Sequence, residues 1–183
     1  MKSSLRTLLV VYISVFLCLI LSQCSSMDKI APEYKGVDPK VEHFVKEYKE
    51  LAEMNGITFK HEVTIGFKNI RQKDTIGICY SGAKWREIDL DIDYWNNSNN
   101  TTHLTLLYHE LSHCFCGRKH DYEKGKLYPE VDELRNKSIN YENGYYPDHC
   151  PKSILYPIIL DNQCVTSHYG DYVAEMFDRC IEW

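Results

Sequence analysis

The stretch His109-Glu110-Leu111-Ser112-His113, with Gly117 and His120 shortly after it, is the most informative segment of the chain. Residues four apart in a helix lie on the same face, so the two histidines can bind one metal ion. The glutamate between them can reach a water molecule on that ion. The stretch therefore predicts a zinc site of the kind that hydrolases use.

The flanking residues predict that this stretch lies on a helix. The segment from Asn99 to Tyr108 is a helix start, because an Asn or Thr side chain can cap free amides. Gly117 ends the helix, since glycine enters the left-handed cap conformation without steric cost, and the chain can then turn back. Apolar residues recur at helical spacing: Leu104, Leu107, Tyr108 and Leu111.

Catalytic zinc has three protein ligands and an open fourth position for water. We expect one catalytic Zn²⁺ bound by His109, His113 and His120. The Glu110 carboxylate is expected to act as general base toward the metal-activated water and to pass the proton to the leaving amine.

These motifs resemble the metzincin clan of zinc endopeptidases, whose signature is HExxHxxGxxH followed by a methionine-containing turn. Here the spacing is HExxHxxxGxxH, with Cys116 where the clan has glycine. Downstream, Cys150 to Pro157 contains a similar turn, S-I-L-Y-P, with Leu155 in place of methionine. The resemblance spans roughly Cys79 to Pro157, and small bacterial metallopeptidase-like lipoproteins are the most similar branch. It implies an α+β, zincin-like fold: a small mixed sheet packed on the active-site helix, with an N-terminal and a C-terminal helix.

Two other ligand assignments stay open. A different zincin branch takes its third ligand from a glutamate on a later helix, and Glu130 and Glu133 are available. We favour His120, because Pro129 and the short polar run after it make a poor ligand helix. Cys116 could also bind zinc, although thiolates are more typical of closed structural sites.

The N-terminus predicts export. Lys2 and Arg6 precede an apolar run from Leu8 to Leu21, which suits the core of a secretory signal. Leu-Ser-Gln-Cys ending at Cys24 resembles a bacterial lipobox, in which the cysteine is lipidated. Ser25 after it would permit sorting to the outer membrane. An ordinary signal peptide with an incidental cysteine is the alternative.

We therefore divide the chain into a signal peptide (1–23), a tether (24–37) and a metallopeptidase-like domain (38–183) at the bacterial cell envelope. Removing Lys2 and Arg6 with the signal takes two positive charges from the formal net charge of −5, leaving −7. Such an acidic chain without a basic stripe is a poor partner for nucleic acid. We expect a monomer that binds a protein or peptide substrate and meets the membrane only through Cys24.

Other elements are predicted from periodicity. They are a helix from Asp38 to Asn55, strands at Ile57–Phe67, Ile76–Tyr80 and Trp85–Tyr94, and a helix at Ser167–Arg179. The third strand alternates apolar and acidic residues, which predicts one solvated face rather than a cation site. Its acidic residues are Glu87, Asp89, Asp91 and Asp93. By the resemblance, this strand would line the cleft and pair with an extended peptide.

Six cysteines remain in the predicted domain, and an exported protein is expected to oxidise them. Of 15 connectivities, we favour Cys79–Cys114 and Cys150–Cys164. A phenol from Tyr145, Tyr146 or Tyr156 could stabilise an oxyanion, although packing is the more common role of tyrosine. The remaining histidines lack metal spacing and are expected at the surface or core edge: His43, His61, His103, His149 and His168.

Two functions fit the sequence. The first is a zinc-dependent endopeptidase anchored to the cell envelope. The second is a lipoprotein that keeps the zincin scaffold as a binding or assembly module. The enzyme is favoured, because Glu110 is not a ligand and a purely structural metal would not need it.

Overall fold

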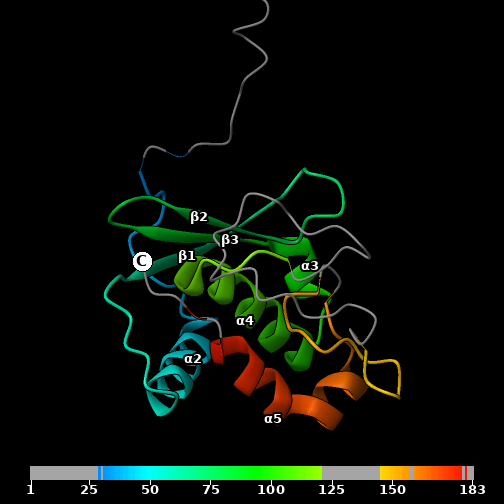
Figure 1. The fold of residues 1–183 in the computed structure, drawn as a ribbon. Coiled ribbons are helices and arrows are strands. Elements are labelled where there is room, and N and C mark those ends of the chain that lie inside the picture. The colour runs from blue at the N-terminus through cyan, green and yellow to red at the C-terminus, as the bar shows by residue number, and fades with distance from the viewer. Residues whose placement is uncertain (1–28, 30, 121–144, 157–158, 179, 181–183) are drawn as a thin grey trace, which may run out of the picture. The chain divides into compact units, whose positions relative to one another are not determined.

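The structure is a computed structural model that describes residues 29, 31–120, 145–156, 159–178 and 180. From Ala31 onward the chain forms one compact unit. Within the described ranges this unit is a mixed α+β fold with a three-stranded sheet and four helices (Figure 1). The predicted α+β class, small mixed sheet, and N- and C-terminal helices are confirmed at this level.

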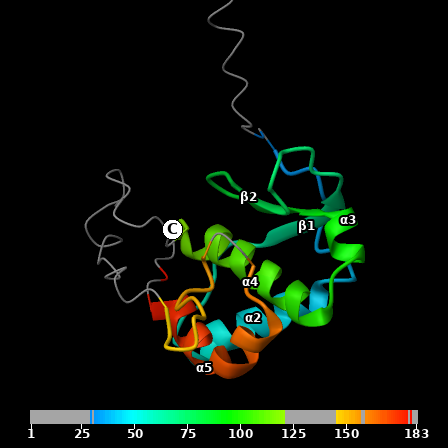
Figure 2. The same cartoon turned by 90° about the vertical axis from the view of Figure 1, so that its right-hand side faces the viewer.

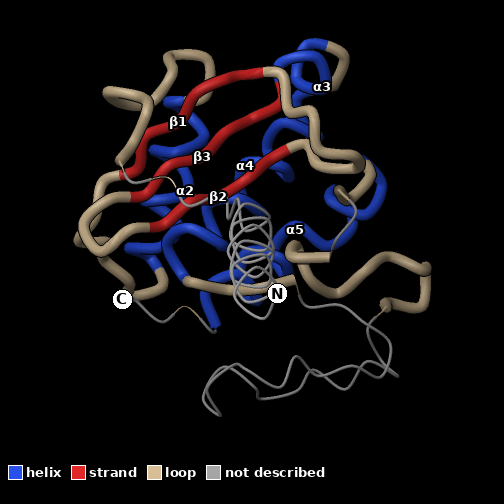
Figure 3. Tube along the Cα trace, turned by 90° about the horizontal axis from the view of Figure 1, so that it is seen from above, coloured by secondary structure: helices blue, strands red, loops and turns tan. Residues whose placement is uncertain are grey.

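The sheet consists of β1 (Val63–Lys68), β2 (Gly77–Ser81) and β3 (Arg86–Asp91), in the spatial order β1-β3-β2 (Figure 3). β1 runs parallel to β3, whereas β2 is antiparallel to it. Ile88 of the central strand is in register with Ile65 on one side and Cys79 on the other. β2 is therefore an outer strand, and β3 has a strand on each side.

The helix that carries the histidine motif, α4 (Asn100–Cys116), passes beneath the sheet. The sheet packs on one side of α4, while α2 (Glu42–Met54) and α5 (Asn162–Asp178) pack on the other (Figures 1 and 2). A short helix, α3 (Ile92–Asn96), follows β3. Because α4 lies between these layers, most of its residues are buried, including Leu107 and Leu111 at 0% exposure.

The predicted ends of α4 are confirmed. The Asn99 side chain accepts a hydrogen bond from the Thr102 amide at 3.0 Å, and Gly117 adopts a left-handed conformation with φ 60°. The first helix was expected to begin at Asp38 but begins at Glu42. The Asp38 carboxylate instead accepts the Lys40 amide at 2.9 Å and caps the turn that leads into α2.

The predicted solvated face of the third strand is wrong. Glu87 and Asp89 are both fully buried. The strand also ends at Asp91 rather than Tyr94, because the Asp91 carboxylate accepts the Tyr94 amide at 2.8 Å and caps α3. Asp93 lies in the first turn of that helix.

The N-terminal segment explains this burial. The backbone amides of Glu33 and Tyr34 donate to the Glu87 carboxylate, which also accepts from Thr64 Oγ1 at 3.3 Å. The Tyr34 ring covers Gly66, where a Cβ atom would lie 2.2 Å from the ring. Residues 36–38 hydrogen bond to Ile65 of β1. Part of the segment expected as a tether thus covers the sheet.

Two further boundaries differ from the prediction. The strand expected from Ile57 begins at Val63, and Phe59 stacks on Phe115 of α4 with 4.2 Å between ring centroids. The C-terminal helix begins at Asn162, five residues before the predicted start, and contains a kink at His168. Neither alternating apolar residues nor helical spacing registers such tertiary contacts.

Among the described residues, no helix is both long enough and apolar enough to cross a membrane. The predicted signal segment and Cys24 lie outside these residues.

Replacing Glu87 should test how strongly the N-terminal segment is held. We expect Glu87→Ala to lower the free energy of unfolding by about 1–3 kcal/mol, because it removes the acceptor of two backbone amides. Chemical denaturation would measure this change. Glu62→Ala is the control, since that side chain is 88% exposed and its ion pair with Lys49 contributes little. Equal effects of the two substitutions would contradict the role of Glu87.

Candidate metal centre

Helix α4 brings the three residues of the predicted motif to one region. His109 and Glu110 are buried, at 4% and 5% exposure, and His113 is half-buried one helical turn later. His120 lies beyond the Gly117 cap and is exposed. The region is therefore closed on the helix side and open to solvent on the side of His120.

The three predicted histidine ligands converge. The Nε2 atom of His109 lies 3.0 Å from Nε2 of His113 and 3.0 Å from Nε2 of His120. Together they form one of the groups in the described chain that could hold a metal ion. The alternative ligands Glu130 and Glu133 lie outside the described residues.

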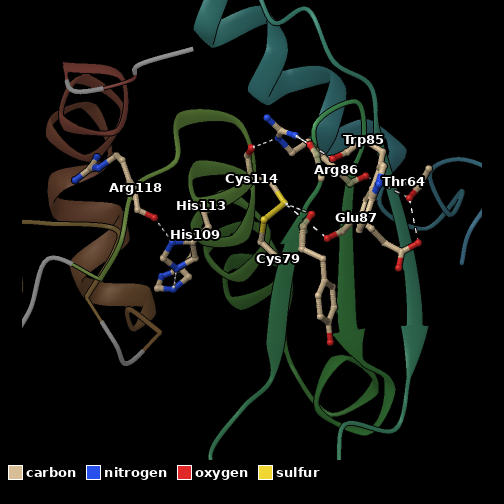
Figure 4. The surroundings of a disulfide bond; sticks show 11 residues. Thr64, Cys79, Trp85, Arg86, Glu87, His109, His113, Cys114 and Arg118 are labelled. Carbon is tan, nitrogen blue, oxygen red and sulfur yellow. Dashed lines mark hydrogen bonds between the residues drawn. A yellow bond between two sulfur atoms is a disulfide. The ribbon is translucent and has the colours of Figure 1, made fainter. Parts of the chain in front are cut away.

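Backbone carbonyls set the tautomers of two of these rings. His109 Nδ1 donates to the carbonyl of Ile154 at 2.9 Å, and His113 Nδ1 donates to the carbonyl of Arg118 at 2.5 Å. Figure 4 shows the Arg118 carbonyl directed at the His113 ring, while its guanidinium points the opposite way. With Nδ1 protonated in a neutral ring, each Nε2 carries a lone pair directed into the group.

The pKa of His109 lies well below its ordinary value. Burial is the main cause, followed by the neighbouring imidazoles of His113 and His120. His109 is therefore neutral at pH 7, which is the form that binds a metal ion.

This donor set fits zinc. Two lone pairs that face each other at 3.0 Å repel unless a cation lies between them. Two nitrogens bound to one tetrahedral zinc, each at about 2.0–2.1 Å, are separated by about 3.3 Å. The observed separations need only a small adjustment to reach that value. Carbonyl partners on the second ring nitrogen are also typical of zinc-binding histidines.

Glu110 points from α4 toward β2, one of the two outer strands of the sheet. Burial raises the pKa of Glu110 to about 8, and a hydrogen bond from the Cys79 backbone opposes this shift. A Cβ atom at Gly77 would lie 2.6 Å from Glu110 Oε1, so only glycine leaves room for the carboxylate. A nearby cation would favour the ionised form of Glu110, which is the form that accepts a proton.

Three disulfides lie in the described chain, and two of them involve cysteines of α4. The predicted pairs Cys79–Cys114 and Cys150–Cys164 are confirmed, and a third joins Cys116 to Cys180. Figure 4 shows the first of them between β2 and α4, on the same helix as the two histidines. The alternative in which Cys116 binds zinc is wrong, because its thiol is consumed by the third disulfide.

Two other groups in the described chain have ligand types near one another. One includes Cys150, which is in a disulfide. The other consists of Glu33 with Glu87 and Asp89. Glu87 accepts backbone amides and Asp89 pairs with Lys68, so both carboxylates already have protein partners. The histidine group is therefore the best metal site that the described residues offer.

Five other polar residues singled out in the sequence make structural contacts. His103 stacks on Trp95 and bonds to its carbonyl at 2.8 Å. Tyr146 stacks on His168, and the hydroxyls of Tyr145 and Tyr156 lie 2.5 Å apart. None of these contacts points to chemistry.

Sequence reasoning missed the groups that support the site. The carbonyls of Ile154 and Arg118 leave no sequence signal, since every residue has one. Gly77 could have been noticed as a glycine within a predicted strand, a position that often marks a close approach. Comparison of the chain with protein-family models, curated proteins and solved structures finds no match.

The third ligand can be tested by metal affinity. We expect His120→Ala to weaken zinc binding by more than about 100-fold, because losing a ligand should exceed the about 10–100-fold typical of a lost supporting contact. Competition with a chelator would measure the affinity. His43→Ala is the control, since that histidine is exposed on α2. If Glu130→Ala or Glu133→Ala abolished binding while His120→Ala did not, a glutamate would be the ligand instead.

Proposed function

We propose that the chain is a zinc-dependent endopeptidase. One observation carries the proposal: Nε2 of His113 and Nε2 of His120 each lie 3.0 Å from Nε2 of His109, and the next residue on α4 is the buried Glu110. Three neutral nitrogen ligands leave a fourth zinc position for water or substrate. A purely structural zinc would not need a buried glutamate between two of its ligands.

The histidines and Glu110 would have different roles in the reaction. His109, His113 and His120 would hold the zinc, which when bound supplies the Lewis acidity that makes water a usable nucleophile near neutral pH. Glu110 would accept the proton of the attacking water and donate it to the leaving amine. Its position is supported by the Cys79 amide and by the space that Gly77 leaves.

The substrate would bind along β2. The resemblance implies this role for the third strand, but β3 is central and is paired with β1 and β2 on its two sides. β2 is an outer strand, and its Gly77 lies against Glu110. An extended peptide added beside an outer strand gains main-chain hydrogen bonds that do not depend on its sequence.

The proposed location follows from the N-terminal sequence alone. The apolar run and the lipobox-like cysteine favour export and a lipid anchor at Cys24 in the bacterial envelope. The metallopeptidase assignment does not depend on this anchor.

Replacing Glu110 separates the enzyme from a binding module. We expect Glu110→Gln to bind zinc nearly as well as wild type but to lose hydrolysis by about 10² to 10⁴, because the amide cannot accept the proton. A digest of a broad peptide library gives the rate, with the exposed Glu50→Gln as control. Cleavage at the wild-type rate would rule out Glu110 as the base. Zinc binding without cleavage by either protein would instead favour the binding-module function.

Gly77 offers a second test. We expect Gly77→Ala to displace the Glu110 carboxylate and lower kcat by up to about 100-fold, because small misplacements of reacting groups have effects of that size. Zinc affinity should change little. Gly170→Ala is the matched control, since nothing lies within 4 Å of the added Cβ. Unchanged kcat in Gly77→Ala would show that the tight contact with Glu110 has no part in catalysis.

A further inference from the structure

Two loops orient the metal-binding rings. The His109 ring is held by the carbonyl of Ile154, and the His113 ring by the carbonyl of Arg118. Both carbonyls belong to residues outside any helix or strand, 36 positions apart in the chain. Backbone hydrogen bonds hold parts of both loops, through the isolated Tyr145–Pro151 bridge and through the Arg118 amide, which donates to the Ser112 carbonyl at 3.4 Å. Side-chain contacts from α5 add to them.

Glu175 on α5 contacts both loops. Its Oε1 atom accepts from the Arg118 guanidinium and from Ser153 Oγ at 3.2 Å. Its Oε2 atom accepts the Ile154 amide at 3.4 Å. The guanidinium also donates to the backbone carbonyls of Glu175 at 2.9 Å and of Met176 at 3.4 Å.

Ile154 and Arg118 therefore each contact both Glu175 and a metal-binding histidine. The Ile154 amide donates to Glu175, and the Ile154 carbonyl accepts from His109. The Arg118 guanidinium donates to Glu175, and the Arg118 carbonyl accepts from His113. The Glu175 carboxylate thus bonds directly to both residues whose carbonyls orient the histidine ligands.

From this arrangement we infer that Glu175 is a positioning residue for the metal centre. It acts through Arg118 and Ile154 to hold His109 and His113 in the orientation that binds zinc. The inference rests on the metal-binding part of the proposed function.

Burial of the ion pair supports a positioning role over simple stabilisation. Arg118 is 8% exposed, Ser153 is 6% exposed, and the Glu175 side chain is 18% exposed. A buried ion pair is a poor source of stability, because the desolvation of both charges offsets their attraction. Such a pair instead fixes the relative orientation of the two side chains, since guanidinium and carboxylate bind in a defined geometry.

The test is Glu175→Gln, which keeps the size of the side chain and removes its charge. We expect zinc affinity, measured by chelator competition, to fall by about 10–100-fold, as is typical when a group that orients a ligand is lost. With Co²⁺ in place of zinc, the visible absorption spectrum should also change, because it reports ligand geometry directly.

Asp171→Asn is the matched control. It makes the same chemical change one turn earlier on α5, at a side chain that is 65% exposed. Ser153→Ala is a milder second variant that leaves the Arg118–Glu175 pair in place and removes one hydrogen bond to the carboxylate, together with the acceptor of the Leu155 amide. It keeps the test decisive if Glu175→Gln fails to fold, and we expect a smaller loss of affinity with a shifted Co²⁺ spectrum.

The outcomes are distinguishable. Weaker zinc binding and an altered Co²⁺ spectrum in Glu175→Gln, with Asp171→Asn unchanged, would support the inference. Wild-type affinity and spectrum in folded Glu175→Gln would overturn it while leaving the zinc site intact, as would an unchanged spectrum in Ser153→Ala where Glu175→Gln does not fold. A wild-type protein that binds neither metal would overturn the proposed function and the inference together.

Discussion

Helix α4 is buried between the sheet and two other helices, yet it carries two imidazoles and a carboxylate, and this conflict shapes the rest of the molecule. A buried polar group without a partner is strongly destabilising. Each of the three has one from a different segment: Ile154 for His109, Arg118 for His113 and Cys79 for Glu110. The loops that contain Ile154 and Arg118, together with β2, therefore supply the hydrogen-bond partners of the polar side chains of α4.

The disulfides attach those segments covalently. Cys79 both supplies the backbone group that bonds to Glu110 and joins β2 to α4. Cys116 lies two residues before Arg118, and Cys150 lies four residues before Ile154. A small domain has a limited core, and cross-links restrict its unfolded chain. Here they also limit how far the supporting segments can move from the histidines.

Local chemistry explains what could be predicted from the sequence. The cap at Asn99, the stop at Gly117 and the convergence of His109 with His113 depend on residues within one or two turns of each other. The burial of Glu87 could not be predicted in this way. Alternating acidic residues indicate a solvated face only if no other segment covers it, and the covering amides come from more than 50 positions earlier. The positioning role inferred for Glu175 could not be predicted either, because it depends on tertiary contacts between α5 and the loops that contain Arg118 and Ile154.

Two departures from the HExxHxxGxxH pattern have structural explanations. The helix runs one residue further, to Cys116, so the glycine cap and His120 are displaced together and the three Nε2 atoms still converge. The turn has Leu155 where the resembled pattern has methionine, and that side chain is fully buried. The contact that orients His109 comes from the neighbouring backbone carbonyl, which no side-chain replacement removes. The apolar side chain of the turn then needs only to fill its space, a requirement that leucine and methionine meet with similar volumes.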